Sequence, residues 1–270
     1  MGYPLTLELQ IIVSLFIFLT GLCVGSFLNV CIYRIPLEKS IVFPPSSCPG
    51  CNARLHEKDL VPVASYILLG GKCRYCKSKI SLQYPLIELL TGILWLAVYL
   101  KFGFTVETAA FIYLFSILTA IFFIDLKHMI IPNGLVLLAI AGGALIFVYN
   151  LFKPFTLFQS TYWYTPLIGM FSASGILFIV SIIGFLIYKN DGAMGMGDVK
   201  LFIPIGMFLG WKLALFALFV SIMAGGIISI FLLIFKIKDR KSAIPFGPFI
   251  IIGTFIAVMY GSTILNWNFL

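Results

Sequence analysis

Long uncharged stretches alternate with short polar segments along this 270-residue chain. The first stretch, Leu9–Ile32, contains 24 residues without a charge, enough to cross the hydrocarbon core of a bilayer as one helix. A polar segment follows, and apolar stretches then resume as far as the C-terminus. The sixth stretch is short, as expected for a tilted or re-entrant piece. We predict about eight transmembrane helices, near 9–32, 85–100, 108–124, 135–149, 166–188, 199–211, 213–235 and 246–265.

This pattern predicts an all-α polytopic membrane protein in three parts. Residues 1–33 form the first transmembrane helix, 34–84 a cytoplasmic insert, and 85–270 a transmembrane domain that carries the chemistry. Composition agrees, because 61% of the residues are hydrophobic and 10% are charged, against about 25% charged in average soluble domains. An ordinary soluble globular protein is therefore excluded.

The distribution of basic residues predicts the orientation. With the N-terminus outside, 15 of the 18 Lys and Arg residues fall in cytoplasmic segments and three fall outside, as the positive-inside rule requires. The net charge of +8 is thus explained by loops beside an anionic membrane surface and calls for no nucleic-acid partner. The insert, Asp125 and Asp198 would all face the cytoplasm.

Two Cys-x-x-Cys pairs stand in the insert, Cys48 with Cys51 and Cys73 with Cys76. Four thiolates in two such pairs match a tetrahedral zinc site that leaves no position open for catalysis. Two disulfides are the alternative, but a cytoplasmic location disfavours them. We expect structural zinc, since the small insert has little apolar content for a core of its own. His56, between the pairs, is a possible substitute ligand.

Two aspartates stand at the cytoplasmic edge of predicted helices, where carboxylates are rare and costly. Asp125 ends the third helix and Asp198 begins the sixth. Two carboxylates that lie close together share a proton, and such a pair can activate a water and protonate a leaving amine. Alternatively, each is an interfacial residue beside Lys127 or Lys200, which are also possible accessory residues.

Glycines and two further acids complete the candidate site. Gly195 and Gly197, just before Asp198, permit close backbone approach and positive φ, and so predict an active-site loop. Glu88, one turn into the second helix, either hydrogen-bonds a neighbouring helix or borders the active cavity. Asp191 stands in a turn-like sequence and is expected to be structural.

Taken together, these motifs resemble those of the bacterial prepilin peptidases, the type IV leader peptidases of the A24 class of membrane aspartic proteases. The resemblance runs over nearly the whole chain and includes the paired Cys-x-x-Cys insert and Asp125 seven residues before Pro132. The other matching motifs are Gly25–Val30, Tyr33–Pro36, Tyr84–Glu88, Gly195–Leu201 and Ile244–Pro248.

The resemblance implies a function for each part. Asp125 and Asp198 would be the catalytic pair that removes the basic leader of type IV prepilins or pseudopilins, after a Gly and at the cytoplasmic face of the bacterial inner membrane. The intact insert implies a second activity, N-methylation of the new N-terminus with S-adenosylmethionine. Because the chain has no Gly-rich nucleotide loop of the Rossmann kind, the donor site is expected near residues 25–29 and the cysteines.

Two other classes of protein remain open at this point. Intramembrane acids and a broken helix also occur in ion-coupled transporters. A non-enzymatic membrane scaffold could use the zinc-binding insert to dock a partner. In either reading the lipid bilayer is still a partner of the chain. The basic leader of a substrate would require local acids, for which Glu38, Glu57, Asp59 and Asp239 are candidates.

Overall fold

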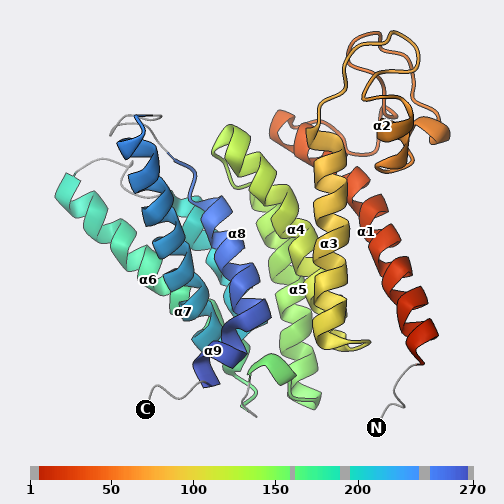
Figure 1. The fold of residues 1–270 in the computed structure, drawn as a ribbon. Coiled ribbons are helices and arrows are strands. Elements are labelled where there is room, and N and C mark those ends of the chain that lie inside the picture. The colour runs from red at the N-terminus through yellow and green to blue at the C-terminus, as the bar shows by residue number, and fades with distance from the viewer. Residues whose placement is uncertain (1–5, 159–161, 189–194, 237–243, 267–270) are drawn as a thin grey trace. The chain divides into compact units, whose positions relative to one another are not determined.

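The computed structural model describes residues 6–158, 162–188, 195–236 and 244–266 (Figure 1). Among these residues, seven helices are long and apolar enough to span a membrane. The fold is therefore that of an all-helical polytopic membrane protein, as predicted. The elements are α1 (Leu7–Arg34), η1 (Ile35–Leu37), η2 (Glu57–Asp59), α2 (Ala64–Leu68), α3 (Gln83–Phe102), α4 (Val106–His128), α5 (Asn133–Phe152), η3 (Thr156–Phe158), α6 (Thr165–Tyr188), α7 (Met196–Ile234), α8 (Gly247–Ile256), η4 (Ala257–Gly261) and α9 (Ser262–Asn266).

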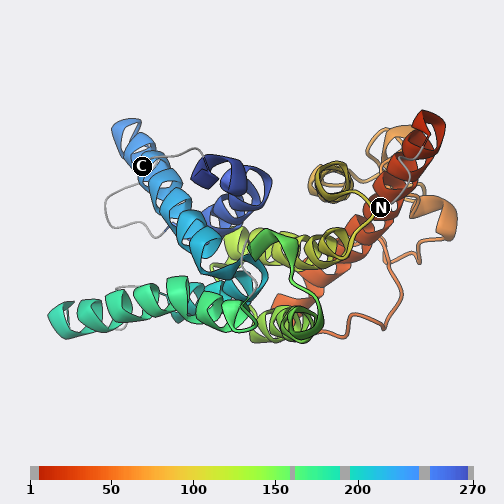
Figure 2. The same cartoon turned by 90° about the horizontal axis from the view of Figure 1, so that it is seen from below.

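The chain divides into two compact units, residues 1–120 and 121–270. In the first unit α1 packs against α3, and Figure 2 looks along α3 with α1 running obliquely past it. Small residues four apart on α1 make this contact close. A Cβ added at Gly21 would lie 2.8 Å from the Cα of Gly92, and one at Gly25 would lie 2.7 Å from the Cα of Glu88. This is the small-residue packing expected between helices in lipid, where close contact replaces the hydrophobic effect.

Polar side chains tie both ends of the insert to these helices. Arg34, the last residue of α1, donates hydrogen bonds to the carbonyls of Ser40 and Pro44 over 3.0 and 2.6 Å. Asn29, buried in α1, donates to the carbonyl of Tyr84 in the first turn of α3 over 3.1 Å. The insert thus leaves and re-enters the helix pair at fixed points.

In the second unit α7 packs against α5, α6 and α8. Gly169 of α6 and Gly206 of α7 approach so closely that a Cβ on either would overlap the carbonyl oxygen of the other. Ser181 of α6 contacts Met196, so the first part of α7 runs antiparallel to α6. Gly253 of α8 meets the second part of α7, where its Cβ would lie 2.5 Å from the carbonyl oxygen of Ala217. Glycines therefore determine how closely these helices approach one another where they cross.

A kink at Gly210 joins two of the eight predicted stretches without a loop, so together they count as one element, α7, among the seven long helices. The predicted helices 199–211 and 213–235 are two arms of α7, residues 196–209 and 211–234, separated by the non-helical Gly210 with φ 72° and ψ 171°. The second arm ends near α8, where Gly225 lies beside Phe246 and Phe249. The first arm is about 21 Å long, which is less than the thickness of the hydrocarbon core. The prediction that the sixth apolar stretch is short is therefore confirmed.

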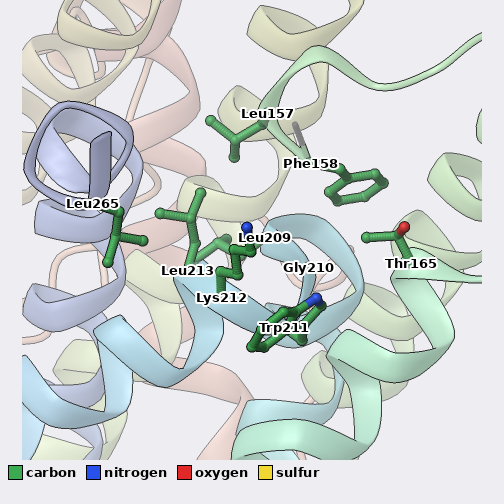
Figure 3. Close-up of a pocket in the computed structure, with 9 residues that line it drawn as sticks. All are labelled: Leu157, Phe158, Thr165, Leu209, Gly210, Trp211, Lys212, Leu213 and Leu265. Atoms are coloured by element: carbon green, nitrogen blue, oxygen red, sulfur yellow. The ribbon is translucent and has the colours of Figure 1, made fainter. Parts of the chain in front are cut away.

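A small hollow lies at this kink (Figure 3). Its volume of about 10 Å³ has room for no more than one water molecule. It is therefore a packing feature of the kink and no substrate cavity. The residues around it are Leu157, Phe158, Thr165, Leu209, Gly210, Trp211, Lys212, Leu213 and Leu265.

Candidate active site and metal cluster

Asp125 lies near the C-terminal end of α4 with only 5% of its surface exposed. The backbone N–H of Gly247, the first residue of α8, donates a hydrogen bond to its Oδ2 over 3.1 Å. The N-terminus of a helix carries unpaired N–H groups and a partial positive charge, so it suits a carboxylate. A buried carboxylate is thereby held in one orientation by a fixed donor.

Glycine is needed at position 247 for this contact. A Cβ there would lie 2.5 Å from Oδ2 and 3.1 Å from Cγ of Asp125, well inside van der Waals contact. In the sequence, Gly247 is only one residue of the motif 244–248, and nothing in that motif indicates its role. The contact joins residues 122 positions apart, so no local pattern could have revealed it.

Asp198 stands in the first turn of α7 and is half-buried. Its backbone N–H donates to the carbonyl of Gly195 over 3.1 Å, which closes the turn before the helix. The start of α7 lies against the segment that follows α4, because Gly197 is beside Ile131 and Lys200 bonds to Asn133, and this places Asp198 where the charge of Asp125 acts on it. Both belong to the second compact unit. The fold therefore brings together two aspartates that are far apart in the sequence.

The two glycines before Asp198 behave differently from one another. Gly197 makes the predicted close approach, because its Cβ would lie 3.2 Å from the Cβ of Ile131. Positive φ occurs at neither glycine, because Gly195 has φ −67° and Gly197 already belongs to the first turn of α7. A Cβ at Gly195 would make only ordinary contact, at 3.5 Å, with Oδ2 of Asp198. Its small size keeps the space beside that carboxylate open.

The lysines near the aspartates do not neutralise them. Lys200 donates to the side-chain oxygen of Asn133 over 3.3 Å, and Lys127 is exposed. Among the described residues, no ion pair involves Asp125 or Asp198. With the contact of Gly197 on Ile131, the Lys200 bond fixes the start of α7 against the segment that follows α4. The pairing of each aspartate with its neighbouring lysine is thus not observed.

The four cysteines of the insert form one cluster. Their sulfur atoms all lie within 4.8 Å of one another, and Cys48 Sγ and Cys76 Sγ are 3.8 Å apart. Tetrahedral zinc with Zn–S bonds of about 2.3 Å requires sulfurs about 3.8 Å apart, so the cluster fits such an ion. His56 does not belong to the cluster. The cysteines are free thiols in the structure, without disulfides.

The two Cys-x-x-Cys turns share one backbone design. Cys48 N–H donates to Ala53 and Cys73 N–H to Ser78, over 3.0 and 2.8 Å, and an isolated β-bridge flanks each turn. The residue after the second cysteine of each pair is left-handed, with φ 57° at Asn52 and 59° at Lys77. Two equivalent turns that face each other present four sulfurs from two sides, as a structural zinc site requires.

Electrostatics in the cluster favours a bound cation. Backbone N–H groups of Gly50 and Cys51 lower the pKa of Cys48 to about 6. The backbone at Ala53 favours the Cys51 thiolate, but burial, hydrogen bonds to Cys76 and Cys48, and the charge of Cys48 outweigh it and raise the Cys51 pKa to about 11. The negative charge of the Cys48 thiolate thus opposes the ionisation of Cys51. A divalent ion removes this conflict, because it compensates the charge of all four sulfurs.

Asp59 braces the second cysteine turn. Its side chain is 4% exposed and accepts hydrogen bonds from Arg74 Nε over 2.6 Å and from the Tyr75 hydroxyl over 3.0 Å. The Arg74 hydrogen bond holds the pKa of the Asp59 carboxyl below its ordinary value. Arg74 and Tyr75 lie between Cys73 and Cys76, so this acid positions the turn and is not a free acid for a substrate leader.

The remaining predicted residues have separate places. Glu88, 7% exposed in α3, accepts a hydrogen bond from the backbone N–H of Val63 in the insert over 2.7 Å. It also interacts with Ser26 of α1, so the predicted contact with a neighbouring helix is present. Asp191 and Asp239 lie outside the described residues.

Known proteins resemble the chain along almost its whole length. Residues 19–102 match the bacterial peptidase A24 N-terminal domain, and residues 112–230 match the type IV leader peptidase family. A prepilin leader peptidase/N-methyltransferase of Bacillus subtilis (strain 168) is 33% identical over 93% of this chain and 96% of its own length. Proteins of the same name from Aeromonas hydrophila and Legionella pneumophila are 33% and 32% identical, over 94% and 96% of this chain and 94% of each relative. No solved structure shows a significant match to the chain.

Proposed function

The chain belongs to the bacterial A24 family of prepilin leader peptidases/N-methyltransferases, and we propose that Asp125 and Asp198 are the aspartates that cleave its substrate. One observation carries this assignment. The buried Asp125 carboxylate, oriented by Gly247, lies within electrostatic range of Asp198 in the same unit. The relatives that match almost the full chain are enzymes, so the chain is an enzyme. The transporter and scaffold alternatives are therefore set aside.

The two aspartates divide the work of an aspartic peptidase. The Gly247 N–H can only donate, so it supports an ionised oxygen on Asp125. We therefore assign Asp125 as the base that takes a proton from water while the water oxygen attacks the scissile carbonyl carbon. Protonated Asp198 gives its proton to the carbonyl oxygen. As the C–N bond breaks, Asp125 passes its proton to the leaving amine, and Asp198 regains one from the collapsing diol.

The substrates we propose are type IV prepilins or pseudopilins, as the name of the relatives implies. Such a precursor places a basic leader in the cytoplasm and an apolar helix in the bilayer. With 15 basic residues on one face and three on the other, the orientation rule puts the N-terminus outside and both aspartates at the cytoplasmic edge of the inner membrane. The scissile bond between leader and helix would then reach the aspartates directly.

Zinc is the ion we propose for Cys48, Cys51, Cys73 and Cys76, since their spacing fits it. All four tetrahedral positions would be occupied by protein, so the ion holds the insert together and binds no substrate. We also propose S-adenosylmethionine as the methyl donor for the second activity in the relatives' name. The described residues form no β-sheet of the kind that usually holds this donor, so helices and the insert must supply its site.

Asparagine substitutions test the aspartate pair. Asp125→Asn and Asp198→Asn keep the side-chain shape but remove the proton chemistry, so each variant should lose leader cleavage. The measurement is mass spectrometry of a co-expressed prepilin, which reports cleavage and methylation together. Methylation of a pre-cleaved pilin peptide shows that the variants fold. Glu8→Gln, on the exposed first turn of α1, is the matched control. Continued cleavage by both asparagine variants would remove the assignment.

A further inference from the structure

One part of the basic insert contains no charge. Residues 60–71 are uncharged and mostly apolar, and α2 lies within them. Apolar stretches of this length, too short to span a bilayer, are typical of interfacial or re-entrant segments when they do not form a buried core. In this stretch the large side chains are not in a core, because Ile67 is 69% and Leu68 86% exposed.

The Glu88 contact fixes the depth of this stretch. Helix α3 has 20 residues and is therefore about 30 Å long, which is close to the hydrocarbon thickness. Glu88 lies five residues after its first residue, Gln83, or about 7.5 Å along the helix. Since Val63 donates to the Glu88 carboxylate over 2.7 Å, α2 begins beside the second turn of the span. Figure 1 shows α2 near the upper ends of α1 and α3.

The backbone at Val63 shows that this attachment is specific. Val63 has φ 61° and ψ −50°, and Ala64 N–H donates to the carbonyl of Pro62 over 2.6 Å. This is a γ-turn with positive φ, a strained conformation that is particularly unfavourable for a β-branched residue. Strain of this kind persists where surrounding contacts hold it. The hydrogen bond from Val63 to buried Glu88 is such a contact.

We propose that α2 lies in the membrane interface, with Ile67 and Leu68 embedded among phospholipid acyl chains. The depth of this stretch selects lipid as the occupant. Val63 is tethered beside the second turn of a membrane span, and the exposed apolar side chains of Ile67 and Leu68 follow four and five residues later. The charges at both ends fit this position. Asp59 is neutralised by Arg74, and exposed Lys72 can extend towards headgroups while its methylenes stay among apolar groups. The insert is thus partly a membrane-bound element.

Photo-crosslinking of the full chain in native membranes tests this directly. Leu68 is replaced by the photoreactive residue p-benzoylphenylalanine, and adducts are identified by mass spectrometry. We expect adducts with phospholipid. The same residue in place of Lys58, exposed in η2, should give none. Absence of lipid adducts at Leu68, or adducts with a co-expressed prepilin in their place, would overturn the proposal and in the second case make this surface a substrate contact.

A second pair of variants tests the tether. In the Leu68-labelled protein, Glu88→Ala removes the acceptor for Val63 and should lose most of the lipid adduct. Glu88→Gln keeps an acceptor oxygen and should retain it. Zinc content measures whether the insert stays folded in both. An unchanged adduct in a zinc-replete Glu88→Ala protein would contradict the role of Glu88. Neither readout depends on peptidase activity, so both are independent of the aspartate assignment.

Discussion

Gly247 and Asp125 form the contact on which the geometry of the proposed active site depends. The backbone of one helix start orients a buried carboxylate at the end of another helix, and no side chain fits between them. Here the donor is a backbone N–H, which any residue except proline would also provide. The site is therefore sensitive to a side chain added at position 247, because its Cβ would clash with the Asp125 carboxylate.

Gly247→Ala should therefore impair cleavage. The added methyl would push the Asp125 carboxylate from its place, and a displacement of about 1 Å costs on the order of 100-fold in rate. The measurement is the cleavage rate on a prepilin in membranes. Gly134→Ala is the matched control, because no atom lies within 4 Å of a Cβ at Gly134. Equal rates for the two variants would show that the Gly247 contact does not matter.

Metal analysis should find about one zinc ion per chain in protein made with sufficient zinc. Cys73→Ser removes a buried ligand of the cluster and should abolish stoichiometric binding, since three thiolates and a hydroxyl bind zinc much more weakly. Cys23→Ser, in α1 and outside the cluster, should bind zinc normally. We expect leader cleavage to survive moderate chelation, because zinc is assigned no step in it. Zinc retained by Cys73→Ser would contradict the four-cysteine site.

Asp59 should influence zinc affinity through the turn that it holds. Loss of its bonds to Arg74 and Tyr75 in Asp59→Ala should weaken zinc binding by about tenfold or more, as for other groups that position metal ligands. Competition with a chromogenic chelator measures this. Glu57→Ala, an exposed neighbouring acid, should have little effect.

The lowered pKa of Asp59 also predicts how the effect of Asp59→Ala on zinc affinity depends on pH. A carboxyl with a lowered pKa in the folded state stabilises the fold above its ordinary value near 4, and the contribution is lost as pH falls through the lowered pKa. The difference in zinc affinity between the unmodified protein and Asp59→Ala should thus be constant from about pH 8 to pH 5. A difference that disappears within this range would mean that Asp59 is not held charged by Arg74.

The crossing of α6 and α7 should tolerate no side chain. Gly206→Ala places a methyl group on the carbonyl of Gly169, and we expect a loss of about 3 kcal/mol of stability, the upper end of the usual range, because the backbone cannot rotate away. Thermal unfolding in detergent measures it. Gly175→Ala, also in α6 but with open space around it, should be neutral or slightly stabilising. Similar melting temperatures for both variants would exclude a tight crossing.

Sequence patterns predicted most of the fold because lipid imposes a simple rule. Apolar length alone located the spans, and cysteine spacing located the cluster, since both signals are local in the chain. The apolar pattern predicts two helices on either side of Gly210, but the kink that joins them at a single glycine depends on φ 72°. That value follows from packing around the kink and has no sequence signature beyond the glycine itself.

The parts of the site that escaped prediction all depend on distant partners. Glu88 was recognised as unusual, yet its partner is the backbone of Val63, and a backbone donor carries no residue type to detect. Gly247 is a second case. The sequence makes Asp59 a candidate contact for the substrate leader, whereas in the structure its carboxylate is already paired with Arg74. Groups with unusual chemistry are visible in a sequence, but only the fold determines which of them already have hydrogen-bond or ion-pair partners.

The crossing at Gly206 has a consequence for how the family can vary. Asp198 lies eight residues before Gly206 on a continuous helical arm, so the number of residues between them sets the direction in which the carboxylate points. Deleting or inserting one residue there would rotate Asp198 by about 100° about the helix axis and shift it by about 1.5 Å. Side chains along this arm can therefore be exchanged, whereas a change in its length would turn the Asp198 carboxylate away from Asp125.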